Sequence, residues 1–468
     1  MRKFLNLFVL LALLFSLCAC NAEVQNESDP ATSSGNVGFT NGSDGQTQNE
    51  EETKRHGLKN LTSTNYAYCC TQEGYYYVPE EFVELADGSW GTHIMYMDFA
   101  TNQEVYLCSD VGCSHDNKSC SAVLSEDEYS PYSGKIFAWN GKLYLLDKDA
   151  DRDGSTTIDL MLGQNMQAVQ AETRPATLYQ MNLDGSDRKK IYTFADGITL
   201  EDTILSSNDG IYFITKKLET DIDGNTTVTT STDRNIVRFS PANKQLKTIM
   251  PLQTDDGISW RIVGCYDNSL VLEGIKYENG NSGSADMSDA EWKELYNKSQ
   301  TVFATLDLSS QKHTDVYQVK NKGLHASATH NGFLYVSEAS SKDIIAIDLR
   351  NGNTSTLASL TQNNIMGVFS DMLICQTWDL TDDYTLYFVS TKDGQVSHCT
   401  LTNKCNGWPL EVICQAGNDA LVIYDYKADA NSDGSYEIHQ YKYALIAKED
   451  LYAGKDTFRP IEMIGKGR

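Results

Sequence analysis

Basic residues are scarce in this chain of 468 residues. Its 38 lysines and arginines stand against 64 aspartates and glutamates, which gives a formal net charge of −26. A chain this acidic repels phosphate backbones, so nucleic acid is not an expected partner. Long apolar runs are also few, because only one segment, at the extreme N-terminus, approaches the length that a membrane requires. Hydrophobic residues still make up 40% of the chain, enough for a large core.

Several catalytic signatures are missing as well. The sequence has no Gly-x-Ser-x-Gly nucleophile elbow, no phosphate-binding glycine motif before a helix and no Asp-box repeats of the sialidase type. Paired carboxylates, which glycosidases need, cannot be recognised among 64 acids without geometry. We therefore assign no catalytic residue and favour a non-enzymatic role, while an enzyme stays open.

The N-terminus reads as a secretory signal. Met1-Arg2-Lys3 precedes an apolar stretch from Phe4 to Leu17, and the stretch ends in Leu17-Cys18-Ala19-Cys20. This ending resembles a bacterial lipobox. The resemblance implies cleavage after residue 19 and attachment of Cys20 to diacylglycerol, with acyl chains such as palmitate in the membrane. The alternative is a plain secretory signal, with Cys20 an ordinary thiol.

Residues 20–64 form the second predicted segment. They are rich in Asn, Ser, Gly, Thr, Gln and Glu and nearly free of large apolar groups, so they cannot bury enough surface to fold. We predict a lipidated, disordered tether. It would hold a folded body off the outer face of the cell membrane, where two or more acyl chains give durable anchoring.

From residue 65 the sequence repeats itself. Short apolar runs alternate with polar turns, and two kinds of run recur seven times each in strict alternation. The first kind begins at Gly74, Gly141, Gly210, Asn268, Gly332, Asp371 and Asp419, and the second at Ile94, Leu178, Ile236, Val302, Ile344, Leu386 and Tyr443.

This repeat predicts an all-β fold. A sheet of three or four strands cannot bury both faces alone, but small sheets packed face to face around an axis can. We predict a β-propeller of about seven blades over residues 65–468, with six or eight possible and a β-sandwich as the alternative. The blade at Gly74 should lie beside the last strands, near residues 443–462, and close the ring.

One blade carries a family resemblance. Leu178-Tyr-Gln-Met-Asn-Leu-Asp-Gly-Ser, followed by basic residues and Ile191, resembles the blade repeat of YWTD propellers of the low-density lipoprotein receptor type. It is also similar to TolB-like propellers and to Gram-positive surface lipoproteins that carry them. The resemblance implies the fold, and hardly any function, because propellers serve binding and catalysis alike.

Three acidic loops are candidate calcium sites, because alternating Asp and Asn side chains before a glycine can converge on one cation. Each could equally be an ordinary hairpin turn, in which Asp-Gly is common. The best candidate is Asp429, Asn431, Asp433, Ser435 and Glu437; the others are Asp149, Asp151 and Asp153, and Glu219, Asp221 and Asp223.

Cysteines offer a second candidate site. Ten of the twelve remain after Cys18 and Cys20 are set aside, an even number that permits disulfides in an exported chain. Cys108, Cys113 and Cys120 lie close together in the sequence with His115 among them. Three thiols and an imidazole suffice for tetrahedral zinc, but the spacing is not that of a standard finger. An oxidising exterior favours disulfides, so both interpretations stay open, and free thiols remain a third.

These observations favour a membrane-anchored extracellular lipoprotein that acts as a binding or protein-interaction module. Its expected partners are the membrane, through the lipid, and an extracellular protein, peptide or glycan. The alternative is a carbohydrate-active or peptide-cleaving enzyme on the same scaffold, which a carboxylate pair about 5 to 10 Å apart in the pocket would favour.

Overall fold

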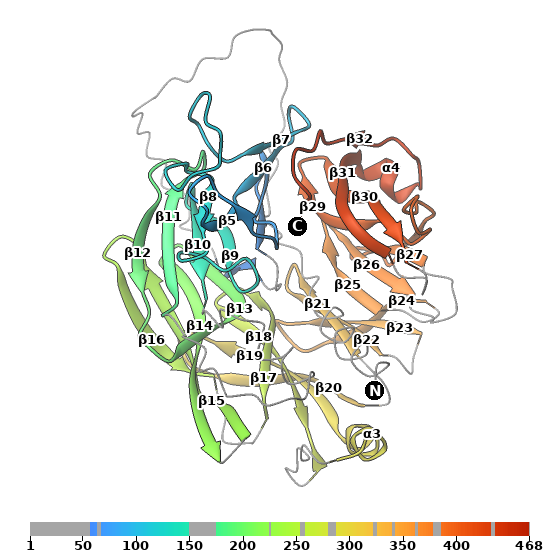
Figure 1. Ribbon diagram of the computed structural model, residues 1–468. Coiled ribbons are helices and arrows are strands. Elements are labelled where there is room, and N and C mark those ends of the chain that lie inside the picture. Colours follow the sequence, from blue (N-terminus) through green and yellow to red (C-terminus); the bar gives the residue numbers. More distant parts are fainter. Residues whose placement is uncertain are drawn as a thin grey trace, which may run out of the picture.

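The computed structural model is nearly all β (Figure 1). It describes residues 57–62, 67–148, 175–223, 226–252, 258–278, 287–321, 325–338, 342–360, 364–377, 385–431 and 436–467. Strands in this part of the chain form eight antiparallel sheets, of which seven have four or five strands and one has three.

The seven larger sheets follow one another along the chain as blades. In chain order they are β2 (Tyr68–Cys70), β3 (Gly74–Tyr77), β6 (Met95–Asp98) and β7 (Gln103–Tyr106); β9 (Lys135–Trp139), β10 (Lys142–Asp147), β11 (Thr177–Asn182) and β12 (Lys189–Thr193); β13 (Ile198–Ser207), β14 (Gly210–Asp223), β15 (Thr226–Ser240) and β16 (Gln245–Pro251), with β1 (Lys59–Thr62) added beside β13; β17 (Trp260–Tyr266), β18 (Ser269–Lys276), β19 (Gln300–Asp307) and β20 (His313–Lys320); β21 (His325–His330), β22 (Phe333–Glu338), β23 (Asp343–Asp348) and β24 (Thr354–Ser359); β25 (Asn364–Phe369), β26 (Met372–Thr377), β27 (Thr385–Ser390) and β28 (Val396–Cys399); and β29 (Glu411–Ala416), β30 (Asp419–Ala430), β31 (Tyr436–Ala447) and β32 (Arg459–Pro460).

The blades are arranged in a ring. Figure 1 shows the colours running around the molecule in chain order, from blue through green and yellow to red. Seven buried hydrophobic clusters lie between neighbouring blades, one for each junction, and the seventh joins the last blade to the first. Each blade thus buries both of its faces against its neighbours, as the sequence predicts for a propeller.

The repeated runs are confirmed as strands. The seven runs of the first kind are the second strands of the blades, β3, β10, β14, β18, β22, β26 and β30, and the seven of the second kind are the third strands. The predicted β-propeller is therefore correct, with seven full blades, or eight sheets when the small one is included. The strand β1 lies inside the segment expected to be a tether and pairs with β13 at the inner edge of the third blade.

The small sheet is an insertion in the first blade. It consists of β4 (Val83–Glu84), β5 (Trp90–His93) and β8 (Val123–Ser125). In the sequence, β4 and β5 lie between β3 and β6, and β8 lies between β7 and β9. Its own core has only four buried residues, Leu85, Cys120, Ala122 and Val123. Arg188 in the second blade donates to the carbonyls of Ser121 and Val123, which attaches the sheet to the ring.

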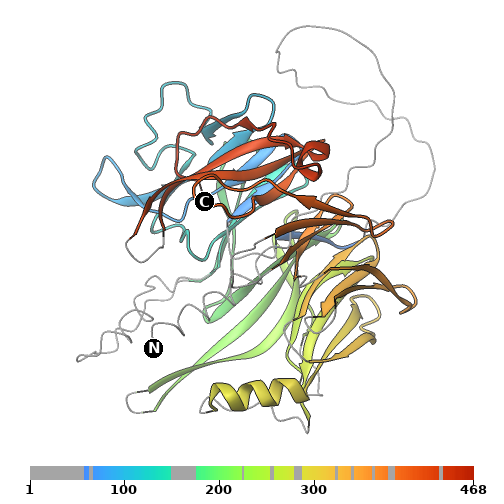
Figure 2. The same ribbon diagram turned by 90° about the vertical axis from the view of Figure 1, so that its right-hand side faces the viewer.

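The first and last blades lie side by side, as predicted. Figure 2 shows the blue strands of the first blade against the red strands of the last. A disulfide joins Cys70 in β2 to Cys414 in β29, across 344 positions of sequence. A C-terminal segment, residues 461–466, lies between the two blades; we call it the clasp. Its Glu462 N–H donates to the Asn102 carbonyl, and its Lys466 carbonyl accepts from Tyr441 N–H.

Two helices accompany the strands in the described part, α3 (Asp289–Lys298) and α4 (Lys448–Tyr452). Ser288 and Glu291 form a capping box at the start of α3: the Ser288 hydroxyl accepts from Glu291 N–H, and the Glu291 carboxylate accepts from Ser288 N–H. Neither helix is long and apolar enough to cross a membrane.

Candidate metal centre and adjoining pocket

The loop between β7 and β8 brings the four predicted Cys and His residues together. The ligand atoms of Cys108, Cys113, His115 and Cys120 all lie within 4.8 Å of one another. His115 Nδ1 lies 3.3 Å from Cys120 Sγ. No disulfide links these three cysteines in the structure, in which all three are free thiols. We call this set the Cys3His cluster.

Two positive φ angles let the loop fold back on itself. Gly112 has a φ of 77°, which glycine adopts freely, and His115 has a φ of 57°, which is uncommon outside glycine. The loop thereby brings Cys108 and Cys113 back toward His115 and Cys120.

The thiols differ in acidity because their surroundings differ. Burial acts to raise the pKa of Cys108, but hydrogen bonds from Asp110 N–H, Ser121 and the two neighbouring cysteines outweigh it, so this pKa lies below its usual value. Burial raises the pKa of Cys120 to about 12, and the Ala122 N–H opposes that shift.

Aromatic side chains connect the Cys3His cluster to a pocket. The ring of Tyr106 stacks on His115, with centroids 4.5 Å apart, and lies 4.8 Å from the ring of His93. His93 Nε2 lies 2.7 Å from the carbonyl oxygen of His115. Burial lowers the pKa of His93. The neutral ring therefore donates its Nε2–H to that carbonyl and keeps Nδ1 as an acceptor.

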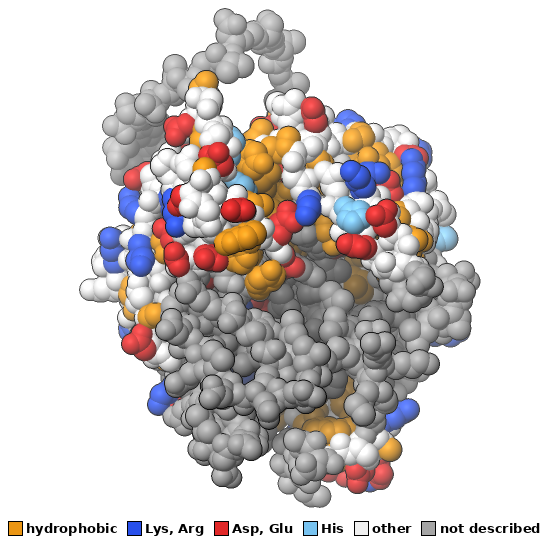
Figure 3. Space-filling view, viewed as in Figure 1, with side chains coloured by type: hydrophobic (Ala, Val, Ile, Leu, Met, Phe, Trp, Pro, Cys, Tyr) orange, Lys and Arg blue, Asp and Glu red, His pale blue; other side chains and the backbone are white. Residues whose placement is uncertain are grey.

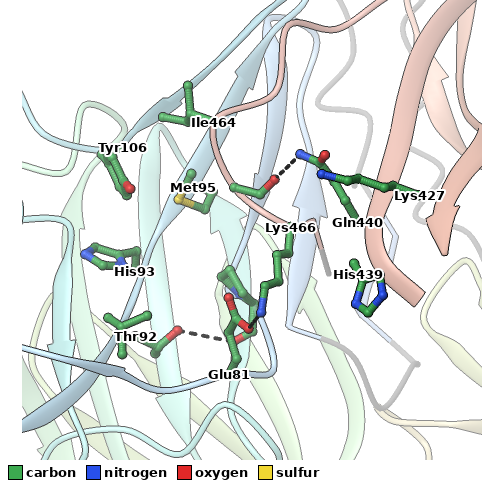
Figure 4. A pocket seen from close by; sticks show the side chains of 13 residues that line it. Glu81, Thr92, His93, Met95, Tyr106, Lys427, His439, Gln440, Ile464 and Lys466 are labelled. Atoms are coloured by element: carbon green, nitrogen blue, oxygen red, sulfur yellow. Dashed lines mark hydrogen bonds and ion pairs between the residues drawn. The ribbon is translucent and has the colours of Figure 1, made fainter. Parts of the chain in front are cut away.

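The pocket opens where the inserted sheet, the clasp and the last blade meet, and its volume is about 430 Å³. Figure 3 shows hydrophobic side chains gathered on this face between the first and last blades. In Figure 4, His93, Tyr106 and Met95 face Lys427, His439 and Gln440 across the pocket. The remaining lining residues are Pro79, Glu81, Val83, Thr92, Ile464, Gly465 and Lys466.

The charges in the lining are unevenly placed. Lys466 Nζ lies 2.6 Å from a carboxylate oxygen of Glu81. This ion pair connects the clasp to the segment that follows β3, and both of its residues line the pocket. His439 Nε2 lies 2.9 Å from Asp429. Lys427 adds a further positive charge. The charged lining residues are therefore Lys427 and the Lys466–Glu81 pair, and the carboxylate of Asp429 lies behind His439.

A buried carboxylate below the pocket was not found by sequence reasoning. Glu104 in β7 is 2% exposed, whereas the next residue, Val105, is 42% exposed. Glu104 Oε2 accepts from the N–H groups of Ile464 and Gly465, both at 2.7 Å, and Tyr77 donates its hydroxyl to Oε1. Hydropathy predicts the reverse burial for this pair, so no sequence signal marks the role of Glu104.

The structure describes the three calcium candidates to different extents. Asp149, Asp151 and Asp153 lie outside the described residues, as do Asp433 and Ser435 of the best candidate. Asp429 and Glu437 of that candidate are opposite each other in the β30–β31 ladder, and Asn431 follows β30. Glu219, Asp221 and Asp223 belong to β14, which is paired with β15, so they lie in a strand and not in a loop. Cys20 lies outside the described residues.

Known proteins give only distant matches to this chain. No family model and no curated protein match the chain. Among solved structures, TolB from Acinetobacter baumannii aligns with 84% of this chain and 81% of its own, at 12% identity and a TM-score of 0.30. A puromycin hydrolase aligns at 10% identity and a TM-score of 0.46 over 86% of this chain, which spans 54% of that protein. An oligogalacturonate lyase in complex with manganese aligns at 12% identity and 0.33, over 77% and 84% of the two chains.

Proposed function

We propose that this protein is a membrane-anchored extracellular lipoprotein whose propeller binds a peptide or glycan that carries a carboxylate. The observation that supports this proposal best is the pocket of about 430 Å³ at the junction of the first and last blades. Concave sites of roughly 300 to 1,000 Å³ with apolar walls and a few polar groups are typical ligand sites.

The lining suits a ligand with two kinds of group. Val83, Ile464 and Tyr106 offer apolar and aromatic surface. Lys427, on the opposite wall, offers a cation, and its exposed position leaves it reachable from solvent. A carboxylate entering the pocket would gain attraction from Lys427, while the strongly acidic remainder of the surface would repel it.

Binding is better supported than glycosidic catalysis at this pocket. A retaining or inverting glycosidase needs two carboxylates flanking the scissile bond. Among the described lining residues, Glu81 is the only carboxylate, and it is already paired with Lys466. The lining thus favours a site that holds its ligand unchanged.

The anchor is proposed from the N-terminal sequence. Leu17-Cys18-Ala19-Cys20 would place diacylglycerol on Cys20, and the acidic mature chain would need no charge attraction to lipid. Replacing Cys20 by alanine should release the protein from the membrane fraction into the medium. Retention of the Cys20→Ala protein in the membrane would contradict the lipid anchor.

The ligand proposal is tested by screening the full-length protein against peptide and glycan arrays that contain acidic and neutral members. We expect acidic members to bind, and Lys427→Glu to weaken that binding about tenfold, because reversing one charge about 5 Å from a carboxylate costs roughly 1 to 2 kcal/mol in water. Lys247→Glu is the matched control, because Lys247 is an exposed lysine on β16 of the third blade.

Two results would contradict the proposal. The first is binding that Lys427→Glu and Lys247→Glu weaken equally, because the pocket would then have no special part in it. The second is recovery of the array ligands as cleaved products, which would make the protein an enzyme.

A further inference from the structure

We propose that Cys108, Cys113, His115 and Cys120 bind one zinc ion in a tetrahedral site that holds the inserted sheet to the first blade. The ligands of this site would be three thiolates and one imidazole. Binding replaces the three thiol protons by Zn²⁺ and releases them to solvent, which leaves a complex with a charge of −1.

The donor atoms already lie where such a site needs them. Zinc–sulfur bonds of about 2.3 Å and zinc–nitrogen bonds of about 2.0 Å in a tetrahedron put donor atoms roughly 3.5 to 3.8 Å apart. The four ligand atoms here lie within 4.8 Å of one another, and one sulfur–nitrogen distance is 3.3 Å. The loop therefore needs to contract by about 1 Å or less to close around the ion.

The inserted sheet needs such a link because its own core is too small. Its strands have two, four and three residues, and its core contains four buried residues. Sheets this small are not stable on their own and are held by disulfides or metals when they occur. The cluster joins the end of β7, in the first blade, to the start of β8, in the inserted sheet, so an ion there would fasten one to the other.

Zinc accounts for the arrangement better than a disulfide does. A disulfide would use two of the three sulfurs and leave the third thiol and the imidazole without a role, although both converge on the same point. Thiolate-rich tetrahedral sites are typical of zinc.

The ion would also shape the pocket wall. The ring and carbonyl of His115 contact Tyr106 and His93, two of the lining residues. This consequence rests on the proposed function, but the metal site itself does not. Zinc content is measured without any ligand, so failure of the ligand proposal and failure of the zinc proposal are distinguishable.

The test is metal analysis of the full-length protein after equilibration with zinc under reducing conditions and removal of free metal. We expect about one zinc per chain for the unmodified protein and for Cys405→Ser, a control in which a thiol outside the cluster is removed. Cys113→Ser should lose most of the zinc. Cobalt should replace zinc and give the visible absorption of tetrahedral thiolate coordination, and Cys113→Ser should lack it.

A second measurement needs no variant, so it remains informative if Cys113→Ser folds poorly. Removing zinc from the unmodified protein with a chelator should speed hydrogen exchange in β4, β5 and β8 and leave the third to sixth blades unchanged. The proposal is overturned if the folded, unmodified protein takes up no zinc, if it holds one equivalent of another metal in place of zinc after this treatment, or if peptide mapping without reductant finds two of these cysteines joined.

Discussion

Replacing Glu104 by alanine should loosen the junction between the first and last blades. This buried carboxylate receives the N–H groups of Ile464 and Gly465 on one oxygen and the hydroxyl of Tyr77 on the other. This side chain thus adds to the bonds of Glu462 and Lys466 that attach the clasp to the first blade. Alanine would leave the buried Tyr77 hydroxyl and the part-buried N–H groups of Ile464 and Gly465 without their acceptor.

The magnitude follows from the number of bonds lost. Hydrogen bonds to a charged group contribute about 1.5 to 3 kcal/mol each, and breaking a buried charged network costs about 3 to 5 kcal/mol. We expect Glu104→Ala to lower the free energy of unfolding by about 4 kcal/mol. Glu104→Gln keeps one oxygen for the two backbone donors, and the Tyr77 hydroxyl can turn to accept from the amide, so about 1 to 2 kcal/mol is expected.

The assay is urea denaturation followed by circular dichroism, with hydrogen exchange measured across residues 461–467. Glu84→Ala, at an exposed position of β4, is the control and should stay within about 0.5 kcal/mol of the unmodified protein. The reasoning is refuted if Glu104→Ala is as mild as that control, or if Glu104→Gln costs as much as Glu104→Ala. Exchange at Ile464 and Gly465 should accelerate in Glu104→Ala before the blades unfold.

Three further predictions concern stability. Cys414→Ser removes the disulfide to Cys70 and should cost about 2 to 4 kcal/mol in urea denaturation, and reductant should then lower the stability of the unmodified protein alone; a reductant effect of equal size on both proteins would contradict this. Phe303→Ala empties a fully buried position between the fourth and fifth blades and should cost about 3 to 5 kcal/mol in denaturant unfolding, whereas a loss below about 1 kcal/mol would refute close packing there. Burial, with the charge of Lys148 nearby, lowers the pKa of Lys135 from 10.5 to about 8 against the opposing attraction of Asp202. Between pH 8 and 10.5 the unfolded chain therefore holds a proton that the folded protein lacks, so stability should rise with pH across this window, by about 3 kcal/mol at most, and Lys135→Met should remove that rise. An unchanged pH profile in Lys135→Met would show that Lys135 keeps its proton when folded.

Part of this fold could be predicted because strands that are buried on both faces of a blade appear in the sequence as apolar runs. The second and third strands of each blade are covered by neighbouring blades, so runs such as Ile211-Tyr-Phe-Ile are apolar and recur. The first strands are less marked: β21 reads His-Ala-Ser-Ala-Thr-His, and no apolar run distinguishes it from a loop. The recurring runs therefore marked the second and third strands of each blade, within the predicted sheets of three or four strands.

The site was predictable only where its residues are close in sequence. The Cys3His cluster spans thirteen positions, so its composition was visible, although geometry was needed to show four donors converging. The pocket combines residues 79–106 with residues 427–466, and the disulfide joins Cys70 to Cys414. Contacts over such separations arise only when the ring closes. The repeat predicted that closure, but not which residues line the pocket or form the disulfide.

The most direct test of a ring closed between the first and last blades is peptide mapping of the protein without reductant. The account predicts a linked pair of peptides that contain Cys70 and Cys414, which reduction separates. Recovery of both cysteines as free thiols, or in bonds to other cysteines, would contradict the ring closure on which the clasp and the pocket depend.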